Sequence, residues 1–248
     1  MLLLLKKELH KSGNPKKAKF LQGFFKTGKG EYGEGDVFIG VTVPESRKIA
    51  QKFAGLSITD VGKLITSKIH EERLVALLIL VYKFQKGNKE TKKEIFDFYL
   101  AHTIYINNWD LVDLSARDIV GSYLFHHSGK VSSGDCTRNP DSLNPILAKL
   151  ARSKNLWERR IAIIATYYFV KRNQFNETLK IAALLTFDQH DLIHKAVGWM
   201  LREVGKRDQK VEEEFLKNCY KKMPRTALRY AIERFPKDLR LSYLNGFI

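Results

Sequence analysis

Apolar residues recur every three to four positions along most of the chain, which is the spacing of an α-helix with one face turned to a core. No stretch shows the sustained apolar–polar alternation of a half-buried β-strand. Asn14 before Pro15 is a typical helix start. The pattern therefore predicts an all-α protein, with helices over residues 2–10, 15–26, from 44 onward, 58–69, 70–85, 89–106, 109–127, 145–152, 156–172, 177–187, 192–206, 212–222 and 224–235.

Two segments interrupt the helical pattern. Residues 27–43 hold five glycines together with Tyr32 and Asp36, and no strand precedes them as a dinucleotide-binding fingerprint requires. We expect a long loop here, which either connects two helices or cradles a phosphate. Residues 128–141 have the composition of turns, with Ser132, Gly134 and Pro140. They predict a loop between stacked helices, and a domain linker is the alternative.

Similar helical segments recur along the chain. Each begins with a basic residue followed by a small residue inside an apolar stripe, and they lie around Arg73, Arg160, Lys195 and Arg225. The spacing is 35 residues from 160 to 195 and 30 residues from 195 to 225, which is typical of paired-helix HEAT-like repeats. We therefore expect a single domain over residues 1–248, built as a curved α-solenoid whose second helices line a concave groove.

Charge indicates what this groove binds. The 248 residues hold 43 Lys and Arg against 27 Asp and Glu, a net charge of 43 − 27 = +16. Such an excess favours a polyanionic partner, nucleic acid first and an anionic membrane surface second, although a soluble basic protein is the simplest reading. Basic residues at helix starts oppose the macrodipole, so they either bind phosphates or cover apolar neighbours with their stems.

Other classes of protein are disfavoured. Cys136 and Cys219 lie far apart and outside any metal-binding spacing, which argues against a disulfide framework and a zinc site and favours the cytoplasm. The apolar start of the chain is too short for a signal peptide, and its longest apolar run, 74–82, is too short to cross a bilayer. We expect no metal site, no membrane partner and a monomer.

The most chemically suggestive segment surrounds Trp109 and Asp113. On a helix, a spacing of four places both side chains on one face, where a π-face and a carboxylate favour a developing cation. The plainer reading is a core tryptophan and a solvated or capping aspartate. Trp157 with Arg160, and Lys195 with Trp199, repeat the pairing of an aromatic with a charged residue at helical spacing.

At these residues the sequence resembles the AlkD family of DNA alkylation-repair glycosylases. The resemblance covers roughly residues 10 to 235, and its main motifs are NWDLVD at 108–113, LWERRIA at 156–162 and HKAVGWMLRE at 194–203, with GVTVPESR at 40–47 as a weaker match. Asn108 departs from the pattern, because the archetype has a second aromatic there; this change predicts a weaker wall of the site. The glycine-rich segment is also longer than in the archetype.

The resemblance implies a HEAT-like solenoid that holds duplex DNA and hydrolyses the N-glycosidic bond of N3- or N7-alkylated purines without a metal or cofactor. It implies that Trp109 and Trp199 pack against the lesion nucleotide, that Asp113 stabilises the cationic sugar or positions water, and that Arg160 holds a phosphate. Further expected DNA contacts are Arg47, Lys48, Arg73, Arg159, Lys195, Arg202 and Arg225. The alternatives are a non-catalytic binder of bent, branched or damaged DNA and a HEAT-type protein scaffold.

Overall fold

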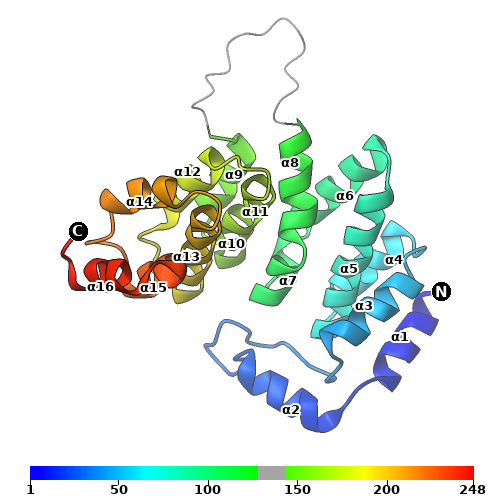
Figure 1. Cartoon of the computed structure of the whole chain (residues 1–248). Helices are drawn as coiled ribbons and strands as arrows, with labels where there is room; N and C mark the ends of the chain where they lie inside the picture. The colour runs from blue at the N-terminus through cyan, green and yellow to red at the C-terminus, as the bar shows by residue number, and fades with distance from the viewer. Residues whose placement is uncertain (128–142) are drawn as a thin grey trace, which may run out of the picture. The chain divides into compact units, whose positions relative to one another are not determined.

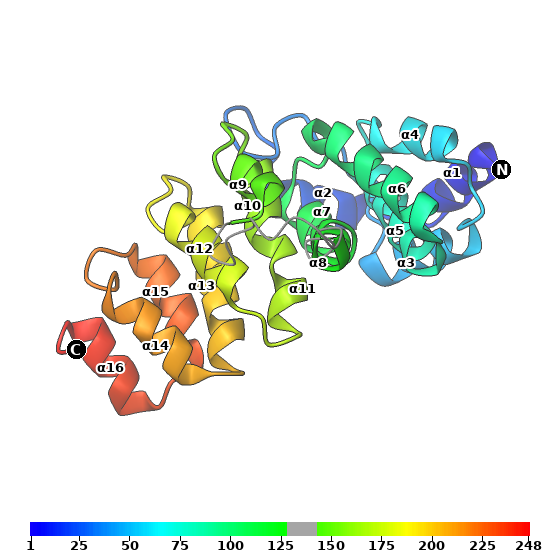
Figure 2. The same cartoon turned by 90° about the horizontal axis from the view of Figure 1, so that it is seen from above.

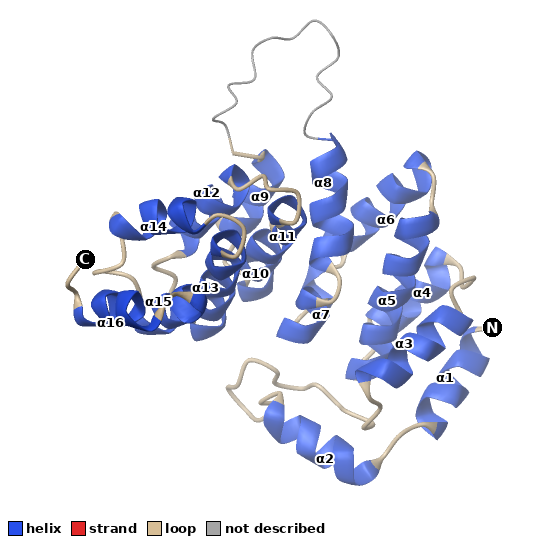
Figure 3. Cartoon of the chain, viewed as in Figure 1, coloured by secondary structure: helices blue, strands red, loops and turns tan. Residues whose placement is uncertain are grey.

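The computed structural model describes residues 1–127 and 143–248 (Figure 1). The predicted loop at 128–141, with Cys136, lies outside the described residues. Within the described part of the chain the protein is made of helices and loops, with an isolated parallel bridge between Val37 and Ile69 (Figure 3). The predicted all-α fold is therefore confirmed.

The chain forms two compact units, Met1–Ile119 and Val120–Ile248. The single domain expected over the whole chain stays a prediction, and each unit is described by itself. The first unit contains α1 (Leu2–Lys11), α2 (Pro15–Phe24), α3 (Val43–Lys52), α4 (Ile58–Ile65), α5 (His70–Lys86), α6 (Lys89–Ala101), a 3-10 turn at Thr103–Tyr105, α7 (Trp109–Asp113) and the start of a π-helical turn at Arg117–Gly121.

The core of the first unit forms around α5. Its residues from His70 to Val81 are all buried, so the helix has no solvent-facing side over three turns. It packs against α3, α4, α6 and α7 (Figure 2). The predicted helix start at Pro44 is confirmed within one residue: α3 begins at Val43, where Thr42 and Glu45 form a capping box.

The second unit contains α8 (Ser122–His127), α9 (Pro145–Ala151), α10 (Leu156–Ala165), α11 (Tyr167–Val170), α12 (Asn176–Leu185), α13 (Asp191–Gly205), α14 (Gln209–Lys217), α15 (Arg225–Ala231), a 3-10 turn at Ile232–Arg234 and α16 (Lys237–Asn245). Helix α13 packs against α10, α12, α14 and α15. Gly198 permits its close approach to α15, because a Cβ there would lie 2.3 Å from the Ala227 carbonyl oxygen.

Several predictions about the helices are wrong. The expected helix 89–106 ends at Ala101, the expected helix 156–172 is divided into α10 and α11, and the expected helix 109–127 is divided into α7, the π-helical turn and α8. Ser115 contributes to this break, because its hydroxyl donates a hydrogen bond to the Leu111 carbonyl oxygen at 2.5 Å and is also 2.9 Å from the Tyr99 hydroxyl. Helix α16 was not expected; its buried residue is Tyr243, so it has too short an apolar stripe to stand out in the sequence.

The helices were considered as possible membrane spans. In residues 1–127 and 143–248, none of them is both long enough and apolar enough to cross a bilayer.

A buried carboxyl in the second unit gives a first testable prediction. Glu212 on α14 is 1% exposed, and burial, together with the charge of Glu213, raises its pKa to about 9 against the attraction of Arg202. The folded protein therefore keeps a proton that the unfolded chain releases above its ordinary pKa of 4.5, and stability falls as pH rises from there towards 9. Glu212→Gln is expected to stabilise the protein by about 1–2 kcal/mol at pH 8.

Urea unfolding at pH 4 and pH 8 measures this effect. At pH 4 the variant and the parent are expected to unfold at nearly the same urea concentration, because Glu212 is then protonated in both states. Glu214→Gln, at an exposed position on the same helix, is the control and changes neither value. Equal stability of Glu212→Gln and parent at pH 8 would contradict the buried, protonated carboxyl.

Candidate functional site

The short helix α7 carries the residue pair that the sequence emphasised. Trp109 occupies its first position and Asp113 its last, so the two side chains leave the same side of the helix one turn apart. The helix begins at Asn108, whose side-chain oxygen accepts the Trp109 N–H at 2.8 Å. Trp109 is partly buried and Asp113 is half-buried, so both the core role and the site role are compatible with their exposure.

Aromatic rings hold Trp109 in place. Its indole stacks on Phe25 with ring centroids 5.0 Å apart and 12° between the planes, and Phe24 meets it edge-on at 6.0 Å. The stack continues from Phe25 to Phe38 at 5.0 Å and from Phe38 to the His70 ring at 4.4 Å. Stacking with such offsets fixes the orientation of each ring, so the position of the tryptophan is determined by α2 and by the loop that follows it.

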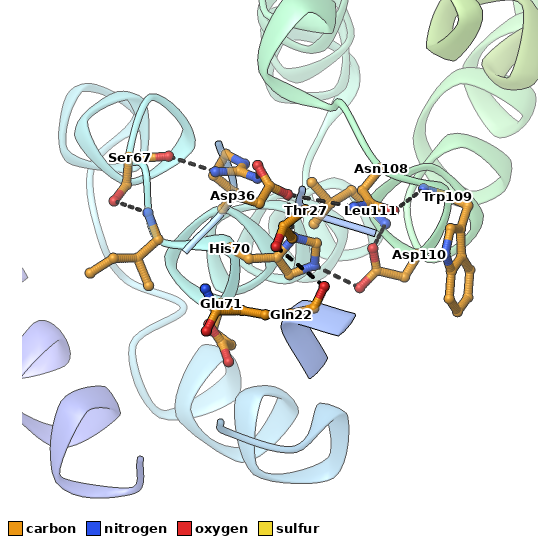
Figure 4. A network of polar contacts seen from close by, with 12 residues as sticks. Gln22, Thr27, Asp36, Ser67, His70, Glu71, Asn108, Trp109, Asp110 and Leu111 are labelled. Carbon is orange, nitrogen blue, oxygen red and sulfur yellow. Dashed lines mark hydrogen bonds and ion pairs between the residues drawn. The ribbon is translucent and has the colours of Figure 1, made fainter. Parts of the chain in front are cut away.

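A buried histidine, His70, lies between Asp36 and Asp110 in a network of polar contacts (Figure 4). His70 is 1% exposed, with Nδ1 3.0 Å from an Asp36 oxygen and Nε2 2.8 Å from an Asp110 oxygen. Burial alone would lower the pKa of His70, but the charge of Asp110 and the hydrogen bonds to both carboxylates outweigh it and raise the pKa to about 9. The histidine is therefore a cation at neutral pH, and it joins the first helical turn of α5 to α7.

Two residues behave differently from their predicted roles. Arg73 was expected to contact DNA, but its side chain is 3% exposed, pairs with Asp36 at 2.6 Å and donates to the Ser67 carbonyl at 2.8 Å. It is inside the protein, so this prediction is wrong. Asn108 is also fully buried and donates to Asp36 at 3.5 Å, so it caps α7 and does not form a wall of the site. Phe24 and Phe25 supply the aromatic neighbours of Trp109 instead.

The glycine-rich loop binds an anion, as one of its two predicted roles required, but this anion is the side-chain carboxylate of Glu71. The backbone N–H groups of Ile39, Gly40 and Val41 all donate to the Glu71 carboxylate, at 2.8 to 3.2 Å. Gly40 has φ of +85°, and a Cβ there would lie 2.2 Å from the Asn14 carbonyl oxygen, so glycine is required. The loop is therefore fastened to the start of α5, and the N–H groups of Ile39, Gly40 and Val41 are already bonded to Glu71.

In the second unit, the two arginines of α10 donate hydrogen bonds to groups of the protein itself. Arg160 is 5% exposed and donates to the Leu192 carbonyl at 2.5 Å. Arg159 forms a two-bond pair with Asp188, at 2.6 and 3.3 Å, and donates to the carbonyls of Ser153 and Lys154. These bonds occupy the donors of Arg159, so the predicted phosphate contact of Arg159 is not supported. The phosphate contact of Arg160 stays a prediction.

Helix α13 collects three other predicted residues on one face, at i, i+4 and i+7. Lys195 pairs with Asp191 at 2.7 Å, the Trp199 N–H donates to Glu203 at 3.3 Å, and Arg202 pairs with Glu233. The Tyr167 ring lies 6.0 Å from the Trp199 ring. Lys195 and Trp199 keep part of their surface accessible to solvent.

The remaining predicted contacts lie on the surface of their own units. Arg47 and Lys48 are exposed on α3, and Arg225 is exposed at the start of α15, where it donates to the Leu244 carbonyl at 2.8 Å. Among the residues described here, no group of three or more His, Cys, Asp or Glu side chains is arranged to hold a metal ion. The structure thus groups the four predicted catalytic residues as Trp109 with Asp113 on α7, and Arg160 with Trp199 on the packed helices α10 and α13.

Comparison with known proteins identifies the family. The sequence model of the DNA alkylation repair enzyme family matches residues 5–235, which is nearly the whole chain. The chain belongs to the DNA alkylation repair enzyme family. No curated protein sequence matches it significantly.

Solved structures share the fold of this family member. A predicted DNA alkylation repair enzyme from Enterococcus faecalis is 19% identical with a TM-score of 0.67, over 91% of this chain and 98% of that one. AlkD2 from Streptococcus mutans is also 19% identical, with a TM-score of 0.54, over 95% and 97% of the two chains. At this identity the likeness concerns the fold alone, and it agrees with an all-α helical-repeat protein.

Family membership gives the protein a role in the repair of alkylated DNA, as an enzyme that binds DNA. The resemblance inferred from the motifs around Trp109, Trp157 and Trp199 is thereby confirmed. Sequence reasoning missed the buried Asp36–His70–Asp110 network, although the run His70-Glu71-Glu72-Arg73 before a fully apolar helix was a signal: charged residues there need buried partners.

Proposed function

We propose that this protein is a DNA glycosylase that hydrolyses the N-glycosidic bond of cationic N3- or N7-alkylated purines in duplex DNA. The observation that carries the proposal is α7, which holds Trp109 and Asp113 on one side and is anchored through the Asp110–His70 ion pair. A helix of five residues has little stability of its own, so this anchor and the stacked rings determine the position of the pair.

The chemistry suits these two side chains. When the bond between C1′ and the purine nitrogen breaks, its electron pair neutralises the positive purine, so the leaving group needs no proton from the enzyme. The sugar becomes an oxocarbenium-like cation, which the Asp113 carboxylate and the face of Trp109 stabilise. Water then adds to C1′ and loses a proton to solvent or to Asp113, and the products are the free base and an abasic sugar.

Residues of the second unit contribute binding in this proposal. Trp199 contacts a nucleotide of the DNA, and Arg160 holds a phosphate. The DNA backbone is contacted by the other predicted cations, Arg47, Lys48, Lys195, Arg202 and Arg225. Arg73 is left out because it is buried, and Arg159 because its guanidinium is bonded to Asp188 and to two backbone carbonyls.

Release of free base tests the proposal. A duplex with a single 7-methylguanine is incubated with excess protein, and the freed base is quantified by chromatography; release well above the spontaneous rate is expected. Binding of the same duplex should weaken by about 2,000-fold between 50 and 200 mM salt, because six phosphate contacts, from Arg160 and the five other cations, give a log–log slope of about −5.4.

The outcomes separate the candidate functions. No release of base, with salt-dependent binding kept, would replace the glycosylase by a non-catalytic binder of bent, branched or damaged DNA. The absence of any salt-dependent DNA binding would exclude both. Asn108, which is buried in the cap of α7, stands where the archetype has a second aromatic residue, and this departure supports the non-catalytic alternative.

A further inference from the structure

A buried carboxylate near the end of α13 binds three neighbouring side chains. Glu203 is 5% exposed. Its oxygens accept hydrogen bonds from the Trp199 indole N–H at 3.3 Å, the Lys206 ammonium at 2.6 Å and the Arg207 guanidinium at 3.3 Å. Burial alone would raise the pKa of Glu203, but the bonds from these three groups outweigh it and lower the pKa, so Glu203 is an anion at neutral pH. One buried charge therefore holds a candidate-site tryptophan and two cations.

Helix α11 adds a second aromatic ring and a third cation. The Tyr167 ring lies 6.0 Å from the Trp199 ring. The Arg207 guanidinium is 6.0 Å and the Lys171 ammonium 5.8 Å from the centroid of the Tyr167 ring, distances at which a cation and an aromatic face attract each other. Helices α11 and α13 pack against each other (Figure 1). The Glu203 cluster is defined as Tyr167, Lys171, Trp199, Glu203, Lys206 and Arg207.

The Glu203 cluster carries excess positive charge that is accessible to solvent. Its three cations and one carboxylate give a net charge of +2. The side chains of Lys206 and Arg207 are 37% and 24% exposed, and Lys171 is exposed. We propose that the cluster is a phosphate-binding site for the DNA backbone, in which Glu203 is a positioning residue that holds Trp199, Lys206 and Arg207 in place before DNA binds.

Stabilisation of the helix end is the simplest alternative role for these cations. Lys206 is the C-cap of α13, where a cation interacts favourably with the macrodipole. That role requires neither a buried carboxylate shared with Trp199 nor a cation from α11. Partly exposed ion pairs also add little stability, whereas burial of the Glu203 charge has a desolvation cost. The arrangement is therefore better explained by a ligand that uses the ordered cations.

The cations keep donors for such a ligand. Both bonds from Arg207 use Nη1, one to the Glu203 carboxylate and one to its backbone carbonyl at 2.7 Å. A guanidinium has five N–H donors and an ammonium three, so Arg207 and Lys206 can each donate further bonds to a phosphate. Arg159 differs, because its Nε, Nη1 and Nη2 atoms are all bonded within the protein.

A DNA strand fits the site better than a single phosphate group. Residues 195, 199, 202 and 206 lie on one face of α13, so Lys206 continues the row of proposed DNA contacts that begins at Lys195. Eleven residues of helix place these two lysines about 16 Å apart along the axis. A row of this length suits a polymer with a charge about every 3.4 Å of axis in each strand. The place of the site beside candidate catalytic residues rests on the proposed function, whereas its binding of DNA does not.

The salt dependence of binding to an unmodified duplex tests the site. Fluorescence anisotropy measures the affinity of the full-length protein from 50 to 200 mM salt. In the Lys206→Gln/Arg207→Gln double variant the log–log slope should be less steep by about 1.8, because two phosphate contacts are lost. Lys171→Gln, which leaves the bonds of Glu203 intact, should make it less steep by about 0.9.

The matched control is the double variant Lys217→Gln/Lys222→Gln. It removes the same charge from exposed positions at the end of α14 and in the turn that follows, and it should leave the slope unchanged. An unchanged slope in both Lys206→Gln/Arg207→Gln and Lys171→Gln, or an equal change in the control, would overturn the site. So would binding of phosphatidylglycerol vesicles in place of the duplex.

The sign of a single substitution tests the positioning role. Glu203→Gln removes a negative charge, which by electrostatics alone should strengthen binding to DNA. If Glu203 orders its partners in advance, the variant should instead bind duplex about 2- to 10-fold more weakly, the cost of ordering one long side chain on binding. Glu214→Gln removes the same charge from an exposed position on α14 and should not weaken binding. Unchanged or stronger binding by folded Glu203→Gln would overturn the positioning role.

The indole N–H signals in a two-dimensional ¹H–¹⁵N NMR spectrum provide a direct readout. The protein has three tryptophans, and Trp199→Phe identifies the signal of Trp199. In Glu203→Gln this signal should move while those of Trp109 and Trp157 stay in place. A Trp199 signal that does not move would contradict the bond to Glu203. Circular dichroism melting shows whether each variant is folded, and Lys171→Gln decides the phosphate site if the variants that disturb Glu203 do not fold.

Release of 7-methylguanine by the parent separates this site from the glycosylase proposal. The expected changes in salt slope, without any base release by the parent, would support the phosphate site while the glycosylase proposal fails. Base release by the parent, with salt slopes unchanged in the cation variants, would overturn the phosphate site and leave the glycosylase intact.

Discussion

Asp113→Asn is expected to slow release of 7-methylguanine from duplex DNA by about 100- to 1,000-fold, the usual effect of removing one charge-stabilising group from a transition state. The substitution keeps the size and polarity of the side chain but removes the negative charge that faces the developing sugar cation. Duplex affinity should change less than about threefold, because Asp113 acts on the transition state more than on the bound substrate. Single-turnover kinetics with saturating protein measure the first quantity, and fluorescence anisotropy of labelled duplex measures the second.

A matched substitution makes the result specific. Asp97→Asn removes an aspartate of the same unit that is exposed on α6 and pairs with Lys93, so it should leave both base release and binding unchanged. Asp113 also lies close enough to Tyr99 to raise the pKa of that buried phenol, after the larger effect of burial. The fold of Asp113→Asn is therefore checked by its melting curve. Full base release by a folded Asp113→Asn variant would remove the carboxylate from the mechanism.

Local pattern was sufficient to predict most of the fold. Helical periodicity and capping residues gave α2 and α5 nearly to their ends and the start of α3, and a spacing of four gave the shared face of Trp109 and Asp113. These features depend on residues within one or two turns of each other. The break after α7 was missed because Ser115 bonds back to the Leu111 carbonyl, a competition with the helix that apolar spacing does not reveal.

The wrong predictions about Arg73 and Arg159 arose because the carboxylates that bind them are distant in the chain. Arg73 and Arg159 stand at helix starts, where a cation opposes the macrodipole, and this was taken to indicate a phosphate. Their partners are Asp36 and Asp188, 37 and 29 residues away, and only the folded chain brings the charges together. The glycine-rich loop is a second example. Its N–H groups bind an anion, and this anion is the carboxylate of Glu71, which lies about 30 residues further along the chain.

His70→Gln is expected to destabilise the protein by about 3–5 kcal/mol at pH 7, since it removes the cation between two buried carboxylates and leaves Asp110 without its partner, whereas Asp36 keeps its ion pair with Arg73. The pKa of His70 is raised to about 9 by folding, so its stabilising contribution is complete below about pH 6.5 and is lost as pH rises through 9. Urea unfolding at pH 6.5 and pH 9.5 should therefore show a smaller difference between variant and parent at the higher pH. His102→Gln, at a half-buried histidine of the same unit, should leave the pH dependence unchanged.

A double substitution distinguishes lost charge from lost packing. If the cost of His70→Gln comes from an uncompensated Asp110, then Asp110→Asn should remove part of it, and the double variant should be more stable than the sum of the two single effects by about 1–3 kcal/mol. Additive effects would mean that His70 acts through its stacking on Phe38 instead.

The same variants test whether the Asp110–His70 bond affects activity. Asp110 lies in α7 between Trp109 and Asp113, so a folded variant with a weakened Asp110–His70 bond should release 7-methylguanine more slowly while it still binds duplex DNA.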